Sequence, residues 1–261
     1  MALFDEAFDG WQAQDFDAWL PSKHASKRYT LERTRVAMRL RSLLEQAVNR
    51  AGLDAAGLQC WTSRPDPNFF NQHKAANCRA LWCREAALRA ALERLDHAVE
   101  AARPEHGHIH VGVRIDLDGL EFALRLPALA NFDHRAAHAG RAALTALVAA
   151  GGGEFEADDQ SSVEALGEAA SPASPQPWAW TLRATRAEAL SGALSVDAVG
   201  ELLVRAWPVL RACMWTVESD PEIAARLAEI GSGARPSPPP PAPPAERLPG
   251  PGESLVRVDA M

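Results

Sequence analysis

Hydrophobic and polar residues alternate from His108 to Ile115, in the segment HIHVGVRI. A period of two predicts a half-buried β-strand with its β-branched residues facing the core. Asp118-Gly119 is typical of a two-residue hairpin turn, and the alternation resumes over residues 120–126. We therefore expect a β-hairpin at the centre of a sheet.

The other segments show either the two-residue period of a strand or the 3.6-residue period of a helix. Strand-like patterns are found at 58–62, 79–83 and 178–184, and helical spacing is found at 3–20, 30–50, 85–102, 131–150, 197–217 and 221–230. Together they predict an α+β fold. Its sheet would be mixed and mostly antiparallel around the hairpin, with helices packed mainly on one face.

Composition divides the chain further. Residues 151–177 are rich in Gly, Ser and Pro and hold six acidic residues and no basic one, which predicts a flexible acidic insertion. From residue 231 the chain is rich in proline and cannot build a core. We expect a single domain over 1–230 and a disordered tail over 231–261.

Charge and cysteine content narrow the class of protein. The net charge of −7 argues against a protein that is basic overall, as many nucleic-acid binders are. Four irregularly spaced cysteines favour reduced thiols and a cytoplasmic location. There is no apolar run long enough for a membrane span and no glycine-rich phosphate-binding motif.

Histidines give the clearest candidate chemistry. His108 and His110 would share one face of the strand, and His134 and His138 would share one face of the following helix. Four imidazoles could hold a divalent metal such as zinc or nickel. The alternative interpretation places the first two at a water-exposed strand end and the other two on a solvated helix face.

The loop after the first strand, SRPDPNFFNQHKAANC, is a second candidate site. Phe69 and Phe70 stand beside Asn71, His73 and Lys74. Aromatic side chains flanked by amides and a cation suit a ligand or a protein partner. Equally, the two phenylalanines could anchor a surface loop beneath the sheet.

Charge reverses between the first two predicted helices. Residues 21–50 hold eight basic residues against two acidic ones, next to an acidic stretch at 3–20. Arg35 and Arg39 could contact nucleic-acid phosphates. Pairing with the acidic helix is the favoured interpretation, because no aromatic residues for base stacking are interleaved with the basic ones.

Three segments carry a resemblance. WLPSKHASKRYTLER, PDPNFFNQHK and HIHVGVRI, in this order of predicted elements, resemble uncharacterised bacterial proteins of high-GC genomes, some labelled as gliding-motility proteins. The resemblance covers about residues 1–220. It contains no catalytic motif, so it implies no site residues.

These patterns favour a non-enzymatic cytoplasmic interaction or scaffold protein with a protein partner and no cofactor. Segregated charge, an aromatic loop and a proline-rich tail suit contacts more than chemistry. One alternative is a metal-dependent hydrolase that uses the four histidines. Another is nucleic-acid binding through the basic helix, which is the less favoured partner class.

Overall fold

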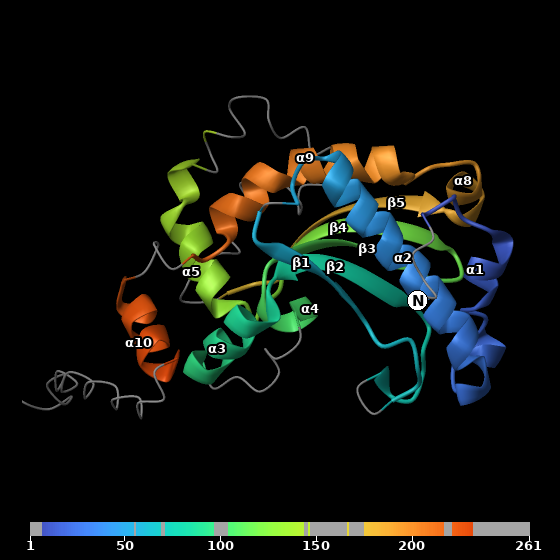
Figure 1. Ribbon diagram of the computed structural model, residues 1–261, viewed down its shortest axis with the longest axis horizontal. Helices are drawn as coiled ribbons and strands as arrows, with labels where there is room; N and C mark the ends of the chain where they lie inside the picture. Colours follow the sequence, from blue (N-terminus) through green and yellow to red (C-terminus); the bar gives the residue numbers. More distant parts are fainter. Residues whose placement is uncertain are drawn as a thin grey trace, which may run out of the picture.

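The computed structural model describes residues 7–54, 56–68, 71–96, 104–143, 146, 166, 175–216 and 221–231. Five strands form one sheet in the order β1-β2-β3-β4-β5, and every pairing is antiparallel (Figure 1). The strands are β1 Leu58–Thr62, β2 Cys78–Arg84, β3 His110–Ile115, β4 Gly119–Leu126 and β5 Trp178–Thr185. The predicted α+β class is confirmed.

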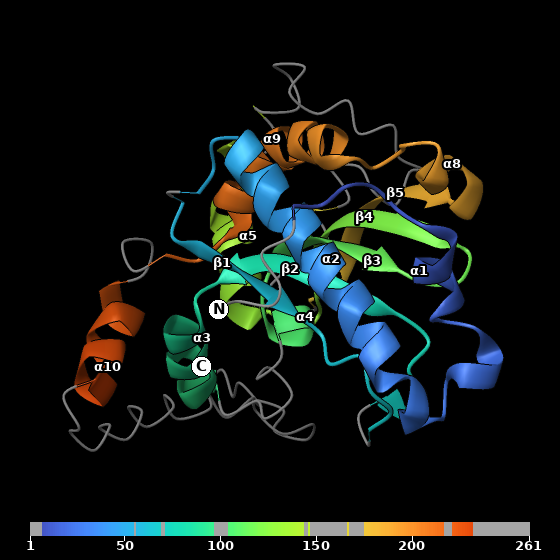
Figure 2. The same ribbon diagram turned by 45° about the vertical axis from the view of Figure 1, so that its right-hand side comes forward.

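Helices surround this sheet unevenly. They are α1 Ala13–Asp17, α2 Thr30–Arg50, α3 Ala86–Asp96, α4 Pro104–Gly107, α5 Asn131–Ala139, α8 Arg186–Leu190, α9 Val196–Cys213 and α10 Pro221–Gly231, with two 3₁₀ turns at Pro21–Lys23 and Lys27–Tyr29. The two longest, α2 and α9, lie side by side across one face of the sheet (Figure 2). This arrangement follows from their apolar stripes, which need a hydrophobic surface to cover them.

The covered face is apolar because every second strand residue points towards α2 and α9. Trp82, Val111, Leu124 and Trp180 are register partners in a row that crosses β2 to β5, and all four are buried. The Trp82 ring lies 5.4 Å from the ring of Trp207 in α9. The sheet and the two helices therefore share one hydrophobic core.

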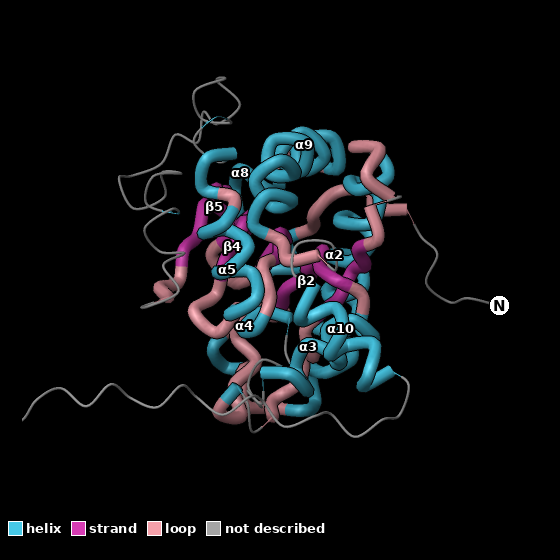
Figure 3. The backbone as a smooth tube through the Cα atoms, turned by 90° about the vertical axis from the view of Figure 1, so that its left-hand side faces the viewer, coloured by secondary structure: helices cyan, strands magenta, loops and turns pink. Residues whose placement is uncertain are grey.

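A smaller core lies at one end of the sheet. Leu92 of α3, Phe132 of α5, Trp215 and Ile223 of α10 form a separate buried cluster. Figure 3 shows α3 and α10 next to each other at this end. The cluster fixes the segment after α9, so Trp215 occupies a defined position near the sheet.

The N-terminal helix predicted over 3–20 is wrong in extent. Gly10 has a φ of +105°, which no α-helix accommodates, and only Ala13–Asp17 is helical within residues 7–20. The hairpin turn is also wider than predicted, with Asp116, Leu117 and Asp118 between the strands. The Asp116 carboxylate accepts hydrogen bonds from the backbone N–H groups of Asp118 and Gly119, which closes this turn.

Two predictions fall largely outside the described residues. Within the insertion predicted at 151–177, Leu166 is described and is fully buried in the main core. The predicted tail after residue 231 lies outside the described part of the chain. No described helix is long and apolar enough to cross a bilayer.

Gly112 should be the glycine of β3 that tolerates no side chain. A Cβ there would lie 2.3 Å from the Ala80 carbonyl oxygen and 2.7 Å from a Leu81 methyl group. Gly112→Ala should lower the free energy of unfolding by about 1–3 kcal/mol, because β2 must move away. Urea titration measures the change.

Gly200 provides the matched control. A Cβ there would lie 3.4 Å from the Ala47 carbonyl oxygen, an ordinary contact distance. Gly200→Ala should leave stability unchanged or raise it by up to about 1 kcal/mol, because alanine is the better helix former. Equal destabilisation by both changes would contradict the steric account.

Candidate functional site

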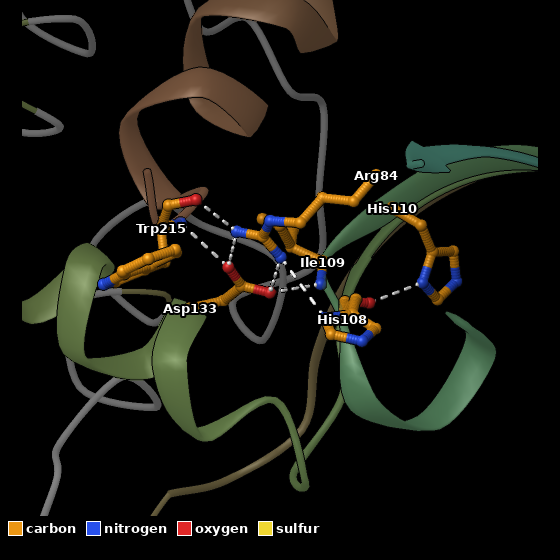
Figure 4. Close-up of polar contacts among 6 residues, drawn as sticks. All are labelled: Arg84, His108, Ile109, His110, Asp133 and Trp215. Atoms are coloured by element: carbon orange, nitrogen blue, oxygen red, sulfur yellow. Dashed lines mark hydrogen bonds and ion pairs between the residues drawn. The ribbon is translucent and has the colours of Figure 1, made fainter. Parts of the chain in front are cut away.

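A buried ion pair stands at the end of the sheet where the predicted histidine site was expected. Asp133, in the first turn of α5, is fully buried and pairs with Arg84, the last residue of β2 (Figure 4). The carboxylate also accepts hydrogen bonds from the backbone N–H of Ile109, at 2.7 Å, and of Trp215, at 2.9 Å. The Arg84 guanidinium donates to the Trp215 carbonyl oxygen at 2.7 Å. One carboxylate thus joins four segments of the chain.

The charges of this pair stabilise each other. Burial alone would raise the pKa of Asp133, but the adjacent Arg84 guanidinium outweighs it and holds the pKa below its usual value. A buried pair whose polar atoms are satisfied serves well as a structural tie. We interpret the Arg84–Asp133 pair as a structural contact that fixes the position of this end of the sheet.

The hairpin histidines belong to this buried region, and neither is exposed to water. The Nδ1 atom of His108 lies 3.3 Å from Arg84 Nη1, so it must accept, and the proton is on Nε2. His110 turns away from Asp133 and donates from Nδ1 to the His108 carbonyl oxygen at 2.8 Å (Figure 4). Burial lowers the pKa of each imidazole to about 4, so both are neutral at pH 7.

The structure does not assemble the predicted metal site. His134 donates from Nε2 to the Pro127 carbonyl oxygen at 2.9 Å, whereas His138 is exposed on α5. Among the described residues, no group of three or more His, Cys, Asp or Glu side chains could hold a metal ion. The lone pair of His108 Nδ1, which a metal would require, already accepts from Arg84.

The basic helix contacts the acidic N-terminal segment. Arg39 forms ion pairs with Asp9, at 2.9 Å, and with Asp15, at 3.3 Å, and its guanidinium stacks over the Phe8 ring. Arg35 contributes to the low pKa of Asp9, after the larger effect of Arg39. The predicted pairing of these two segments is therefore present, although its acidic side is mostly not helical.

The loop after β1 is held by its own amides. Asn68 and Asn71 each accept a hydrogen bond from the other's backbone N–H, and both side chains donate to the Asp66 carbonyl oxygen. Gln72 and His73 have φ values of +53° and +58°, a conformation that is uncommon outside glycine. This tight path turns His73 outward, while Phe69 and Phe70 lie outside the described residues.

A buried arginine ties the same loop to α2. Arg33 is fully buried and donates to the carbonyl oxygens of Pro65, Lys23 and Ser26, at 2.7 to 2.9 Å. Burial lowers the pKa of its guanidinium. Because three backbone segments share one cation, the loop has a fixed position relative to the sheet.

Between this loop and α4 the surface is hollowed into a groove of about 720 Å³, which we call the Arg79 groove. Its cationic lining comes from Arg64, Lys74 and Arg79, against the single carboxylate of Glu105. Polar and aromatic side chains complete it: Trp61, Ser63, Asn68, Asn71, Asn77 and His106. The loop residues Asn71 and Lys74, predicted as binding residues, do line this groove.

Arg79 is the exceptional residue of the groove. Within the described part of the chain its guanidinium has no hydrogen-bond or ion-pair partner, and its charge interacts only at longer range with Glu105 and Glu121. Burial lowers its pKa, although the group stays cationic near neutral pH. A half-buried guanidinium with unused donors is well suited to bind an anion.

Sequence reasoning missed Arg79 because it occurs as one polar residue in the alternating strand pattern of β2. The signal that could have found it is register. Arg79 lies directly opposite Arg114 on β3, and such a pair of like charges is unfavourable without an anion nearby.

No family model, curated protein or solved structure matches this chain. The expected resemblance to gliding-motility proteins therefore stays a prediction. Function must be inferred from the geometry of the groove and its surroundings.

Removing the Asp133 charge should be among the most damaging single changes. Asp133→Asn would leave Arg84 buried without a counter-charge and should lower the free energy of unfolding by about 3–5 kcal/mol. Chemical denaturation measures this loss. Asp54→Asn, at an exposed carboxylate, should change stability by less than about 0.5 kcal/mol; similar losses in both variants would refute the proposed tie.

Stability should fall as pH drops towards the histidine pKa values. Between the ordinary value of 6.5 and the folded value of about 4, the unfolded chain binds protons that buried His108 and His110 do not. Each histidine should therefore lower the free energy of unfolding by up to about 1.4 kcal/mol per pH unit across this window. Urea titrations from pH 7 down to pH 5 measure the slope.

The contribution of His110 can be isolated. His110→Asn removes the titrating group while keeping a donor near the His108 carbonyl oxygen, and it should reduce the pH slope by roughly half. His138→Asn, on the exposed face of α5, should leave the slope unchanged. An unaltered slope in His110→Asn would show that this imidazole titrates normally.

Proposed function

We propose that this protein is a non-enzymatic cytoplasmic interaction protein whose Arg79 groove binds an acidic segment of a protein partner. The observation that carries the proposal is the half-buried Arg79 guanidinium, which lines a cation-rich groove and has no hydrogen-bond or ion-pair partner among the described residues. A carboxylate entering the groove would supply the acceptor that the protein itself does not provide.

The size and lining of the groove support a peptide ligand. Its volume of about 720 Å³ lies within the range of 300 to 1,000 Å³ that is typical of ligand sites. The amide of Asn77 can bind a peptide backbone group, and Trp61 offers an apolar surface. Arg64 and Lys74 are exposed, so acidic side chains on either side of the bound residue could reach them.

The overall negative charge of the chain limits the distance over which the groove can attract an acidic partner. The chain carries a net charge of −7, which opposes long-range attraction of an acidic partner. Specific recognition must then come from the three cations within the groove, and at physiological salt the Debye length is only about 8 Å. Selectivity for a short acidic segment follows from this limit.

The rival functions receive less support. A hydrolase using the predicted histidines would need His108 and His134 to leave the hydrogen bonds that they make with Arg84 and Pro127. Nucleic-acid binding through α2 would compete with the ion pairs of Arg39 to Asp9 and Asp15. Binding of an acidic segment in the Arg79 groove would break neither of these sets of contacts.

A fluorescein-labelled, glutamate-rich peptide provides the direct test, with binding to the full chain measured by anisotropy. We expect salt-sensitive binding that Arg79→Gln weakens about tenfold or more, because a charge-assisted hydrogen bond contributes about 1.5–3 kcal/mol. The same peptide with glutamines in place of its glutamates should not bind.

Arg205→Gln is the matched control, since Arg205 is exposed on α9 outside the groove. It should bind the glutamate-rich peptide as the original protein does. Binding that is equally strong in Arg79→Gln, or that ignores the charge of the peptide, would rule out the groove as an acidic-segment site.

A further inference from the structure

Four arginines surround a single buried glutamate on the sheet face opposite α2 and α9. Register places Arg79, Arg114, Glu121 and Arg183 in one row that crosses β2 to β5. Arg125 lies four residues further along β4, on the same face, and pairs with the same glutamate. The groove therefore borders a sheet face that is rich in guanidinium groups.

Glu121 cannot neutralise this row. Its carboxylate contacts Arg125, Arg183 at 3.0 Å and Arg114 at 3.5 Å, and it is only 3 % exposed. Burial would raise its pKa, but Arg114 and Arg125 hold the pKa below its usual value, so Glu121 is ionised. One carboxylate thus already serves three guanidinium groups.

Arg79 takes no part in these ion pairs. Asp116 pairs with Arg114 at 3.0 Å, so Glu121 and Asp116 are both engaged by the other three arginines of the cluster. In the groove, Arg64, Lys74 and Arg79 face the carboxylate of Glu105, which leaves two excess positive charges in the groove lining. The direct neighbour of Arg79 across the strands is Arg114, a like charge at a Cβ separation of about 5 Å.

The volumes of the two hollows beside Arg79 determine where an anion fits. The hollow enclosed by Arg79, Arg114 and Arg125 has a volume of about 20 Å³. That is room for about one water molecule and not for an oxyanion with a central atom. The groove on the other side of Arg79, at about 720 Å³, has room for such an anion.

We propose that the Arg79 groove recognises a phosphate monoester on the partner's acidic segment, with Arg79 as its bidentate ligand. This inference rests on the proposed function and names its chemistry. A monoester carries close to two negative charges, which matches the excess charge of the groove lining, and a guanidinium fork fits two of its oxygens. A carboxylate has one charge and would neutralise half of that excess.

A phosphopeptide fits better than a nucleic acid. A phosphodiester carries a single charge per unit, and binding along a nucleic-acid strand requires a continuous line of cations. Glu105 interrupts the cationic lining, and Trp61 is the single aromatic side chain of the groove among the described residues. The site is suited to one concentrated charge.

The test compares three versions of the labelled acidic peptide, with serine, glutamate or phosphoserine at one central position. The phosphoserine peptide should bind about tenfold more tightly than the serine peptide and clearly more tightly than the glutamate peptide. Equal binding of the phosphoserine and glutamate peptides would overturn the phosphate inference and leave the acidic-segment function standing. No binding of any peptide would overturn both.

Arg79→Lys separates charge from geometry. Lysine keeps the positive charge but lacks the bidentate fork, so this variant should retain binding of the glutamate peptide and lose the preference for phosphoserine. An unchanged preference would overturn the assigned role of Arg79. Inorganic phosphate that matched the phosphopeptide in affinity would indicate a free-ion site, and a single-stranded oligonucleotide that did so would indicate nucleic acid; both overturn the proposal.

Thermal unfolding gives an independent readout. In phosphate-free buffer Arg79→Gln should raise the melting temperature by about 1–3 °C, because it removes the repulsion from Arg114. The original protein should gain stability when the phosphopeptide is added, and Arg79→Gln should not. A lower melting temperature in the variant would show that Arg79 stabilises the fold, which contradicts the proposal.

Discussion

The Asp133 carboxylate determines how one end of this sheet is built. It accepts from Arg84 at the end of β2, from the backbone entering β3 and from the backbone after α9, so a single side chain joins segments up to 131 residues apart. Breaking the Arg84–Asp133 pair would expose the second core, because Trp215 belongs to both. The buried ion pair therefore holds these segments together, which a small hydrophobic cluster alone could not do.

The burial of His108 and His110 depends on the same Arg84–Asp133 ion pair. His108 can be neutral and buried because Arg84 supplies a donor to its Nδ1 atom, and His110 can be buried because the His108 carbonyl oxygen accepts from it. The alternating spacing of His108 and His110 suggested a metal site. In the structure their imidazoles lie on either side of the backbone where the chain enters β3. Polar residues in a strand are thus not evidence of exposure when a buried charge pair lies next to them.

Sequence patterns were most informative where structure is local. The strands and the longer helices follow from periods of two and 3.6, because each residue's face depends only on its own element. The N-terminal helix was wrong because its apolar spacing continues across Gly10, whose positive φ breaks it. The partners of Asp133 and Arg79 could not be predicted, since they depend on register and on which elements meet. Asn71 and Lys74, predicted from polar loop composition, line the groove, and their role in binding stays a prediction.

One face of the sheet is apolar and covered by helices, whereas the other carries charged side chains. On one face, apolar side chains pack under α2 and α9, and any change there alters the core. On the other, Glu121 pairs with Arg114, Arg125 and Arg183, whereas no described side chain pairs with Arg79, which lies opposite Arg114. A fold selected for stability alone would place an opposite charge at one of these two positions. Arg79 lines the groove and Arg114 lies opposite it in the register, an arrangement that an acceptor from outside the chain would stabilise.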